Sequence, residues 1–344
     1  MEDVMVLYVG LDVSQKETEI CVVDAEGRRV WRGKCSSRPE AIAAVLGEHA
    51  PRATRVGMET GPLAIWLWHG LKALGIPIDC LHARHVAAAL SLQVNKTDTN
   101  DAHGIAQVVR SGWYRAVAIK SLQSCRVRAI LSARRQLVMV RTGLCNQIRG
   151  LLKTFGVVLG AGTGGVFERA VHEQCPDDPL VREAIGALLS AWKVAGERKV
   201  ELERQMIRLS REGDVCRRLA TVPGVGAMTS LTFVTALDDP TRFRRSSDVG
   251  AYLGLTPKRY QSGEVDVGGR ISKSGDRLAR ILLFEAATVL MTRVRKDSAL
   301  RTWGLQLAAR VGNRKARVAV ARKLATILHR IWLDGTEFEP APAH

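Results

Sequence analysis

The sequence predicts an α/β N-terminal domain followed by an all-α remainder, and three observations predict this fold class. Over residues 1–118, short apolar segments typical of buried strands are interleaved with segments of helical periodicity. Over residues 119–212, apolar residues recur at heptad spacing in two long segments, which predicts a helical arm. Residues 213–344 hold apolar and basic helical segments around one glycine-rich stretch. These three ranges are the predicted domains.

The first domain is predicted to contain a mixed sheet with helices on its faces. Three strands come first, with at least one hairpin, and helices and strands then alternate. The predicted strands are 4–13, 17–23, 28–34, 54–59 and 76–82, and the predicted helices are 41–49 and 62–74. The turn DAEG joins the second and third strands, and Ser37 with Glu40 matches a capping box before the first helix.

The segment KTDTNDAHGIA at 96–106 has two interpretations. Asp98 is a favoured helix cap, and Asp101 adds negative charge to the first turn, where the helix dipole favours it. Apolar residues such as Ile105 and Val109 then form a buried stripe, and Gly112 ends the helix. The alternative interpretation is that the two aspartates are half of a metal site. By itself the segment favours a helix start, because capping acids are much commoner than metal ligands.

The arm is predicted to consist of two basic helices, 119–155 and 181–212, with heptad-spaced apolar residues. On the first helix, four arginines are candidates for nucleic-acid contact: Arg134, Arg135, Arg141 and Arg149. The connection between the helices contains GAGTGG at 160–165, which fits the dinucleotide-binding pattern G-x-G-x-x-G. That pattern is meaningful only between a strand and a helix, so we interpret the segment as a flexible loop.

Charge and cysteine usage indicate the class of partner and the compartment. Residues 1–118 carry 13 basic and 13 acidic residues, so the whole net charge of +17 lies after residue 118. A chain with this charge is expected to bind a polyanion. The seven cysteines are scattered, which predicts free thiols in a reducing cytoplasm. Neither a signal peptide nor a membrane span is predicted, and no P-loop occurs.

Four acids form a candidate metal site. Asp12 ends the first predicted strand and Glu59 ends the fourth, whereas Asp98 and Asp101 share one face of a helix start. If the sheet brings them together, their mutual repulsion requires protonation or a bound cation. Oxygen ligands fit hard divalent ions, Mg²⁺ above all, and two such ions commonly serve phosphodiester chemistry. A second cluster around Cys80 lacks a fourth ligand and is interpreted as a strand end, not a zinc site.

The pattern D…E…D-x-x-D, with K-T-D-T-x-D-A, resembles the DEDD-type insertion-sequence transposases, the bridge-RNA-guided recombinases of the IS110 and IS1111 group. The resemblance continues through VPGVG at 222–226, F-x-x-x-x-D-V-G-A-Y-x-G-L-T-P at 243–257, R-Y-x-S-G and R-I-S-K-x-G. It implies a RuvC-like (RNase H fold) N-terminal domain, a coiled-coil arm and a C-terminal transposase domain. It also implies five catalytic residues, of which the first four hold metal: Asp12, Glu59, Asp98, Asp101 and Ser262.

The resemblance further implies the partners. These are Mg²⁺, with Mn²⁺ as a substitute, a noncoding bridge RNA, donor and target double-stranded DNA, and a homodimer that assembles to a tetramer. A serine that attacks a phosphodiester stores the bond energy for rejoining, which agrees with the missing ATP motif. From sequence chemistry alone, Ser262, Ser272 and Ser274 are equivalent. Four cations are expected to hold the phosphate in this glycine-rich loop: Lys258, Arg259, Arg270 and Lys273.

Two alternatives remain open at the sequence level. A RuvC-like junction nuclease would use the acids and a metal-activated water, and it would not need Ser262. A non-catalytic nucleic-acid-binding protein would use the basic arm alone. The segment VPGVG is also open, because a tight turn and a phosphate-binding turn have the same sequence pattern.

Overall fold

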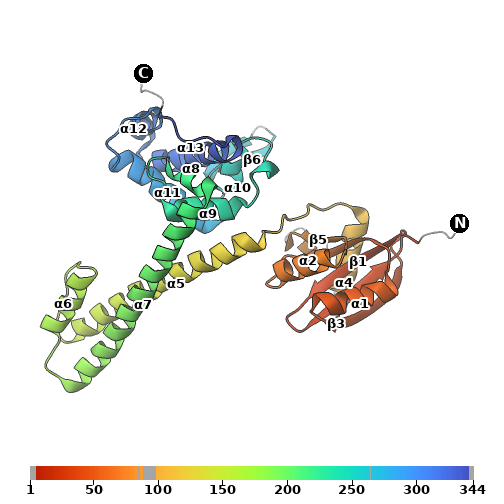
Figure 1. Ribbon diagram of the computed structural model, residues 1–344, viewed down its shortest axis with the longest axis horizontal. Coiled ribbons are helices and arrows are strands. Elements are labelled where there is room, and N and C mark those ends of the chain that lie inside the picture. Colours follow the sequence, from red (N-terminus) through yellow and green to blue (C-terminus); the bar gives the residue numbers. More distant parts are fainter. Residues whose placement is uncertain (1–4, 84–85, 88–97, 264, 341–344) are drawn as a thin grey trace. The chain divides into compact units, whose positions relative to one another are not determined.

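The computed structural model describes residues 5–83, 86–87, 98–263 and 265–340 (Figure 1). It divides into two compact units, Met1–Lys120 and Ser121–His344. The predicted arm and C-terminal domain both belong to the second unit, and the boundary between them stays a prediction. None of the helices among these described residues is long and apolar enough to cross a membrane.

The first unit is built on a five-stranded mixed sheet of order β3-β2-β1-β4-β5. Its strands are β1 Leu7–Val13, β2 Glu17–Val23, β3 Arg29–Ser36, β4 Ala53–Glu59 and β5 Ile78–Leu81. The first three pair antiparallel through short hairpin turns, whereas β4 pairs parallel with both β1 and β5. Parallel pairing requires a crossover, and helices provide it here. The predicted mixed sheet is therefore confirmed.

Helices cover both faces of this sheet. The helices are α1 Pro39–His49, α2 Ala64–Ala73 and α4 Asp98–Ser111. Because side chains alternate along a strand, Val9 and Leu11 of β1 face the core shared with α1 and α2. On the opposite face, Tyr8 packs with Ala102 and Ala106 of α4. Helix α4 therefore covers one face of the sheet, and α1 and α2 cover the other.

The predicted capping box at Ser37 is wrong. Helix α1 begins with Pro39 after Arg38, and no side chain caps it. The Ser37 hydroxyl lies 2.8 Å from that of Thr18 and donates to the Ser14 carbonyl at 2.9 Å. Ser37 is buried, so its hydroxyl needs these partners, and proline at the first helical position already favours the helical φ angle.

The arm is formed by two long antiparallel helices that lie side by side (Figure 1). They are α5 Leu122–Thr154 and α7 Pro179–Glu212, and the shorter α6 Gly165–Gln174 lies between them in sequence. Apolar contacts concentrate at the two ends, around Ile148 with Trp192 and around Leu131 with Met206. Between them the seam is charged. Coiled-coil packing along the whole length therefore stays a prediction.

The charged middle of the seam centres on Glu203. Arg134 donates to it from Nε at 2.9 Å and from Nη2 at 2.6 Å, and Lys199 approaches within 3.1 Å. Burial alone would raise the pKa of Glu203, but the hydrogen bonds from Arg134 and Lys199 outweigh burial and hold that pKa below its ordinary value. Such paired charges favour one register of the two helices, since a shift would leave them unpaired.

The remainder of the second unit is mainly helical, as predicted. Its elements are α8 Asp214–Ala220, α9 Ala227–Leu237, η1 Pro240–Arg242, α10 Asp248–Tyr252, β6 Pro257–Ser262, β7 Val265–Ile271, α11 Arg277–Thr292, α12 Ala299–Val311 and α13 Asn313–Asp334. The core joins buried residues of α9, α11 and α13, including Phe233, Leu290 and Leu324.

The glycine-rich stretch of this unit is a hairpin and not the loop that we expected. Strands β6 and β7 pair antiparallel, and Ser262 lies opposite Val265. Gly263 directly follows Ser262 and has a φ angle of +55°, the positive φ that tight hairpin turns require. Glycines outside the turn had obscured the strand pattern.

Candidate active site

Two of the four predicted acids end neighbouring parallel strands. Leu11 of β1 pairs with Met58 of β4, so the next residues, Asp12 and Glu59, lie at the same edge of the sheet. Both side chains are half-buried. The carboxyl ends of strands in open α/β sheets are where sites commonly form. This placement agrees with the predicted acidic cluster.

Two glycines place these acids on the face of the sheet that α4 covers. Gly10 lies two residues before Asp12, and Gly57 lies two residues before Glu59, so each glycine shares a face with its acid. A Cβ atom on Gly10 would overlap backbone atoms of α4, and one on Gly57 would overlap the Val109 side chain. Helix α4 therefore lies directly on both strands, closer than any other residue would allow.

The other two acids begin the helix that crosses this face. Asp101 lies in the first turn of α4, next to Ala102, whose carbonyl oxygen is one of the atoms closest to Gly10. The start of α4 is thus held near β1, the strand that carries Asp12 close to its end. The backbone of Asp98 opens the helix, but its side chain lies outside the described residues. Within the described part of the chain, no group of three or more potential metal ligands is placed to hold an ion.

Side chains on one edge of α4 tie the helix to the β2–β3 turn. Gln107 donates to the Gly27 carbonyl at 2.6 Å, and Arg110 donates to the Ala25 carbonyl at 3.0 Å. The His103 ring lies 3.5 Å from the Cys21 sulfur, and burial, followed by the charge of Arg29, lowers the pKa of His103. These positioning residues were not predicted from the sequence, although their spacing of 103, 107 and 110 indicates one helix face.

Cys80 lies in strand β5, which agrees with its interpretation as part of a strand end. Cys80 is buried in the sheet, and burial, reinforced by Asp79 and Glu59, raises the pKa of its thiol to about 11. A zinc ligand would have to be a thiolate. His82 is exposed, and His85 lies outside the described residues. All seven cysteines are free.

Ser262 is the last residue of β6, at the turn of the hairpin. Its side chain lies outside the described residues. The four predicted cations are exposed, and they lie along the hairpin and just after it. Arg259 is already bound to Asp266 through two hydrogen bonds of 2.8 and 2.6 Å. Lys258, Arg270 and Lys273 lie nearer the base of the hairpin than its turn.

The segment after β7 is held tightly against the preceding chain. The amide of Lys273, which has a φ angle of +55°, donates to the Gly254 carbonyl at 3.2 Å. A Cβ atom on Gly254 would overlap the backbone of Ser274, so glycine is required there. The Ser272 and Ser274 hydroxyls bond to each other at 2.9 Å. The three serines that sequence chemistry could not separate therefore occupy two different places.

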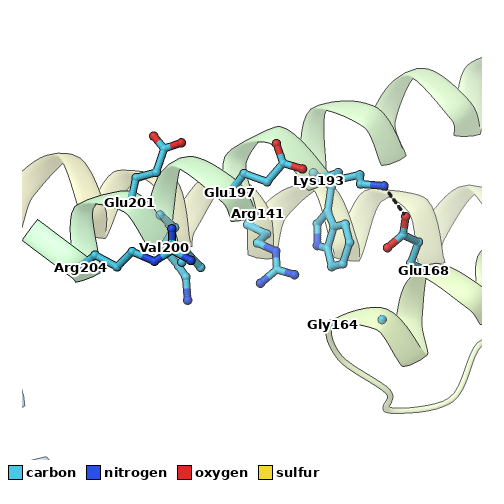
Figure 2. A pocket seen from close by; sticks show the side chains of 12 residues that line it. Arg141, Gly164, Glu168, Lys193, Glu197, Val200, Glu201 and Arg204 are labelled. Carbon is cyan, nitrogen blue, oxygen red and sulfur yellow. Dashed lines mark hydrogen bonds and ion pairs between the residues drawn. The ribbon is translucent and has the colours of Figure 1, made fainter.

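Two of the four predicted arm arginines make hydrogen bonds within the described part of the arm. Arg134 belongs to the ion pair with Glu203. Arg149 donates to the carbonyls of Gly160 and Gly162 at 3.1 and 2.8 Å, which ties the predicted flexible loop to α5. Arg141 stacks on an aromatic ring and lines a cavity (Figure 2). Of these four arginines, Arg135 and Arg141 have no hydrogen bond or ion pair with another residue in the described part of the chain, and both are half-buried.

The VPGVG turn has the features of a packing element. Val222 and Val225 are buried in the core of the second unit. Gly224 has a φ angle of +88°, and a Cβ atom there would lie 2.5 Å from the Ala286 carbonyl oxygen of α11. The glycine is needed for this close approach, which favours the tight-turn interpretation.

Comparisons with known proteins agree with the predicted family. A DEDD-type IS110 transposase model matches residues 9–156, and the model of the transposase IS116/IS110/IS902 family matches residues 216–303. The transposase for insertion sequence element IS1111A of Coxiella burnetii is 28% identical over 333 residues, covering 95% of this chain and 89% of that protein. A probable family 20 transposase of Pseudomonas aeruginosa is 30% identical over 338 residues, covering 96% and 98%. The Thermus thermophilus RuvC structure covers 32% of this chain and 99% of its own, at 13% identity and a TM-score of 0.25.

These similarities extend over nearly the whole chain and both units. The mixed sheet, with three antiparallel strands followed by two parallel ones, and the DEDD-type match confirm the α/β fold class with a RuvC-like N-terminal domain. The relatives of comparable length are transposases, so the expectation of an enzyme that acts on DNA is confirmed as well. The chain belongs to the IS110 family of DNA transposases and recombinases.

Proposed function

We propose that this transposase cuts and rejoins DNA with Ser262 as the nucleophile and a divalent-metal centre on Asp12, Glu59, Asp98 and Asp101. The observation that carries the proposal is the placement of Asp12 and Glu59. They end adjacent parallel strands, on the sheet face crossed by the helix that begins with the other two acids.

The donor set fits a hard divalent cation. Neighbouring carboxylates repel one another, so keeping them ionised at neutral pH requires a positive charge among them. Carboxylate oxygens are the ligands that Mg²⁺ prefers, and Mn²⁺ accepts them too. When bound, such an ion supplies charge neutralisation on the phosphate and activation of the attacking oxygen. The contribution of the protein is to hold Asp101 on a helix that the two glycines seat against the strands.

The covalent step conserves the energy of the phosphodiester bond. The Ser262 oxygen forms a bond to phosphorus while the bond from phosphorus to one deoxyribose oxygen breaks, and the serine proton passes to that oxygen. The DNA is then linked to the protein as a phosphoserine ester, and the reverse attack by another DNA hydroxyl releases the serine. Support for this role comes from the position of Ser262 as the last residue of β6, beside the exposed Gly263. Neither ATP nor a second energy source is needed.

A noncoding bridge RNA is proposed to select the donor and target DNA. All of the +17 net charge lies after residue 118, so the arm and C-terminal part are suited to duplex backbones. Recognition by backbone and shape leaves sequence choice to base pairing. Strand exchange between two duplexes requires several cuts, and we therefore propose a homodimer that assembles to a tetramer.

The serine is tested with a labelled suicide DNA on a denaturing gel. The wild-type chain should give a shifted covalent band, and Ser262→Ala should give neither band nor cut. Loss of one hydroxyl at a hairpin turn should change the free energy of unfolding by less than about 0.5 kcal/mol, so misfolding would not explain the loss. The water-dependent nuclease alternative expects Ser262→Ala to cut normally. A band that persists in Ser262→Ala would move the assignment to Ser272 or Ser274.

A further inference from the structure

A cavity of about 490 Å³ opens in the arm between α6 and α7 (Figure 2). Its walls come from α5, through Arg141, from the start of α6, through Gly164 and Gly165, and from α7, through Lys193 and Arg204. The volume is within the range of sites that hold one small organic ligand, and it is larger than a phosphate ion requires. Neither the acids nor the hairpin serine contributes to it.

Arg141 is held in this wall by stacking. Its guanidinium carbon lies 4.1 Å from the centre of the Trp192 ring, over the ring face. Trp192 in turn is buried and packs against Phe167, with 5.2 Å between ring centres. Gly196 leaves room for the arginine, since a Cβ atom there would lie 3.1 Å from Arg141 Nε. The guanidinium plane is therefore fixed before any ligand arrives.

The donors of Arg141 lack acceptors. Its Nε atom is buried without a hydrogen-bond partner, and none of its nitrogen atoms donates to another described residue. Arg134 and Arg149 differ from Arg141, because each of them makes several hydrogen bonds. A guanidinium carries five N–H donors, and leaving them unmatched in a partly buried place is costly. A ligand that enters the cavity would supply acceptors for these donors.

The opposite wall is the glycine-rich segment that resembled a dinucleotide motif. Gly164 has a φ angle of +60° and precedes α6, and no side chain caps the helix. The first amide groups of α6 therefore have no side-chain acceptor among the described residues, and the helix dipole favours a negative ligand near them. A Cβ atom on Gly164 or Gly165 would meet nothing within 4 Å, so this wall is free of obstruction.

Charge is divided across the cavity. The carboxylates of Glu197 and Glu201 point away from the Arg141 guanidinium, which is directed to the side on which Gly164 lies (Figure 2). Lys193 is neutralised by Glu168 at 3.3 Å. The side between Arg141 and Gly164 is therefore positively charged, and it also offers the planar face of a guanidinium.

We propose that this cavity binds one unpaired nucleotide of the nucleic acid, with its base stacked on Arg141 and its phosphate toward the start of α6. Bases stack on arginine planes where a strand is unpaired, whereas paired bases in a duplex hide their faces. The proposal rests on the proposed nucleic-acid binding and deepens it. RNA and DNA strands share this chemistry, and the test separates them.

The test measures binding of the full chain to short fluorescent single strands of RNA and of DNA, and to the corresponding duplexes, by fluorescence anisotropy. Arg141→Lys keeps the charge and removes the plane. Its affinity for the preferred single strand should fall by about 5- to 150-fold, the usual range for one stacked base, while its affinity for the duplex stays the same. Gly196→Ala, which displaces Arg141, should act in the same direction. The matched control is Arg126→Lys, at an exposed position of the same helix.

Abasic substitutions give a second readout. A single strand with one abasic position should bind the wild-type chain more weakly than the intact strand does. The same abasic position should not change binding to Arg141→Lys. If the effect is seen with RNA, the bound nucleotide comes from RNA, and if it is seen with DNA, the nucleotide comes from DNA. The proposal is overturned if Arg141→Lys binds single strands as the wild type does, or if strand and duplex affinities fall equally. If the wild-type chain binds no nucleic acid at all, the proposed function is refuted together with this proposal. If it binds nucleic acid but Arg141→Lys has no specific effect on single strands, only this proposal is refuted.

Discussion

Helix α4 is seated on the sheet through Gly10, and replacing this glycine by alanine should loosen the acidic site. The added Cβ would overlap the Ala102 carbonyl oxygen and the Ala106 amide nitrogen, which are both backbone atoms. Neither can rotate away, as the end of a side chain could. The helix must therefore move off β1, and Asp101 moves with it.

The magnitude follows from the number and kind of overlaps. Overpacking in a core costs about 1–3 kcal/mol, and simultaneous conflict with two backbone atoms places Gly10→Ala at the upper end, about 3 kcal/mol. Because each 1.4 kcal/mol is a factor of about 10 in an equilibrium constant, local opening of α4 should become roughly 100-fold more frequent. Amides that exchange through this opening should exchange faster by the same factor.

The assay is hydrogen exchange of the full chain followed by mass spectrometry, which reports α4 separately from the arm. Gly47→Ala is the matched control. Gly47 lies inside α1, and a Cβ atom there would meet nothing within 4 Å. Alanine is the better helix former, so this change should stabilise α1 by about 0.5–1 kcal/mol and slow its exchange. Unchanged exchange of α4 in Gly10→Ala would refute the argument that this contact positions the site.

Three further predictions concern the metal, the nucleic acid and the arm. Asp12→Asn should abolish DNA cleavage in a gel assay while circular dichroism shows a folded chain, and full activity of the wild type in excess EDTA would contradict the metal centre. A fragment of residues 1–120 should bind RNA and DNA far more weakly than the full chain, whose affinity should fall steeply with salt; equal affinities would show that the basic remainder is not the binding surface. Burial opposes ionisation of Glu203, but Arg134 and Lys199 hold its pKa below 4.5, so its contribution to stability is complete above pH 4.5 and is lost as the pH falls through the lowered pKa. Thermal unfolding should show a smaller loss on acidification for Glu203→Gln than for the wild type, and identical losses would rule out this source.

Much of the fold could be predicted because the relevant information is local. Strand β2 was predicted with its observed bounds. Polar and apolar residues alternate at its start, and the residues at its end are all apolar. The acids were found for a similar reason. A charged residue at the carboxyl end of a buried strand is unusual in any apolar context, and Asp12 and Glu59 both have this position. The sequence by itself therefore determined the strands of the first unit, the two long helices of the arm, the neutral and basic halves, and the acids worth testing.

The tertiary structure decided which partner each side chain finds. Ser37 looked like a helix cap, but Thr18 and the Ser14 carbonyl, distant in sequence, take its hydroxyl. Arg134 and Arg141 are two helical turns apart on α5 and look alike in the sequence. One meets a glutamate of α7, whereas the other meets a tryptophan and a glycine that leaves it room. Periodicity specifies which face of a helix is buried, but pairing depends on the register of a second helix, which no local pattern contains.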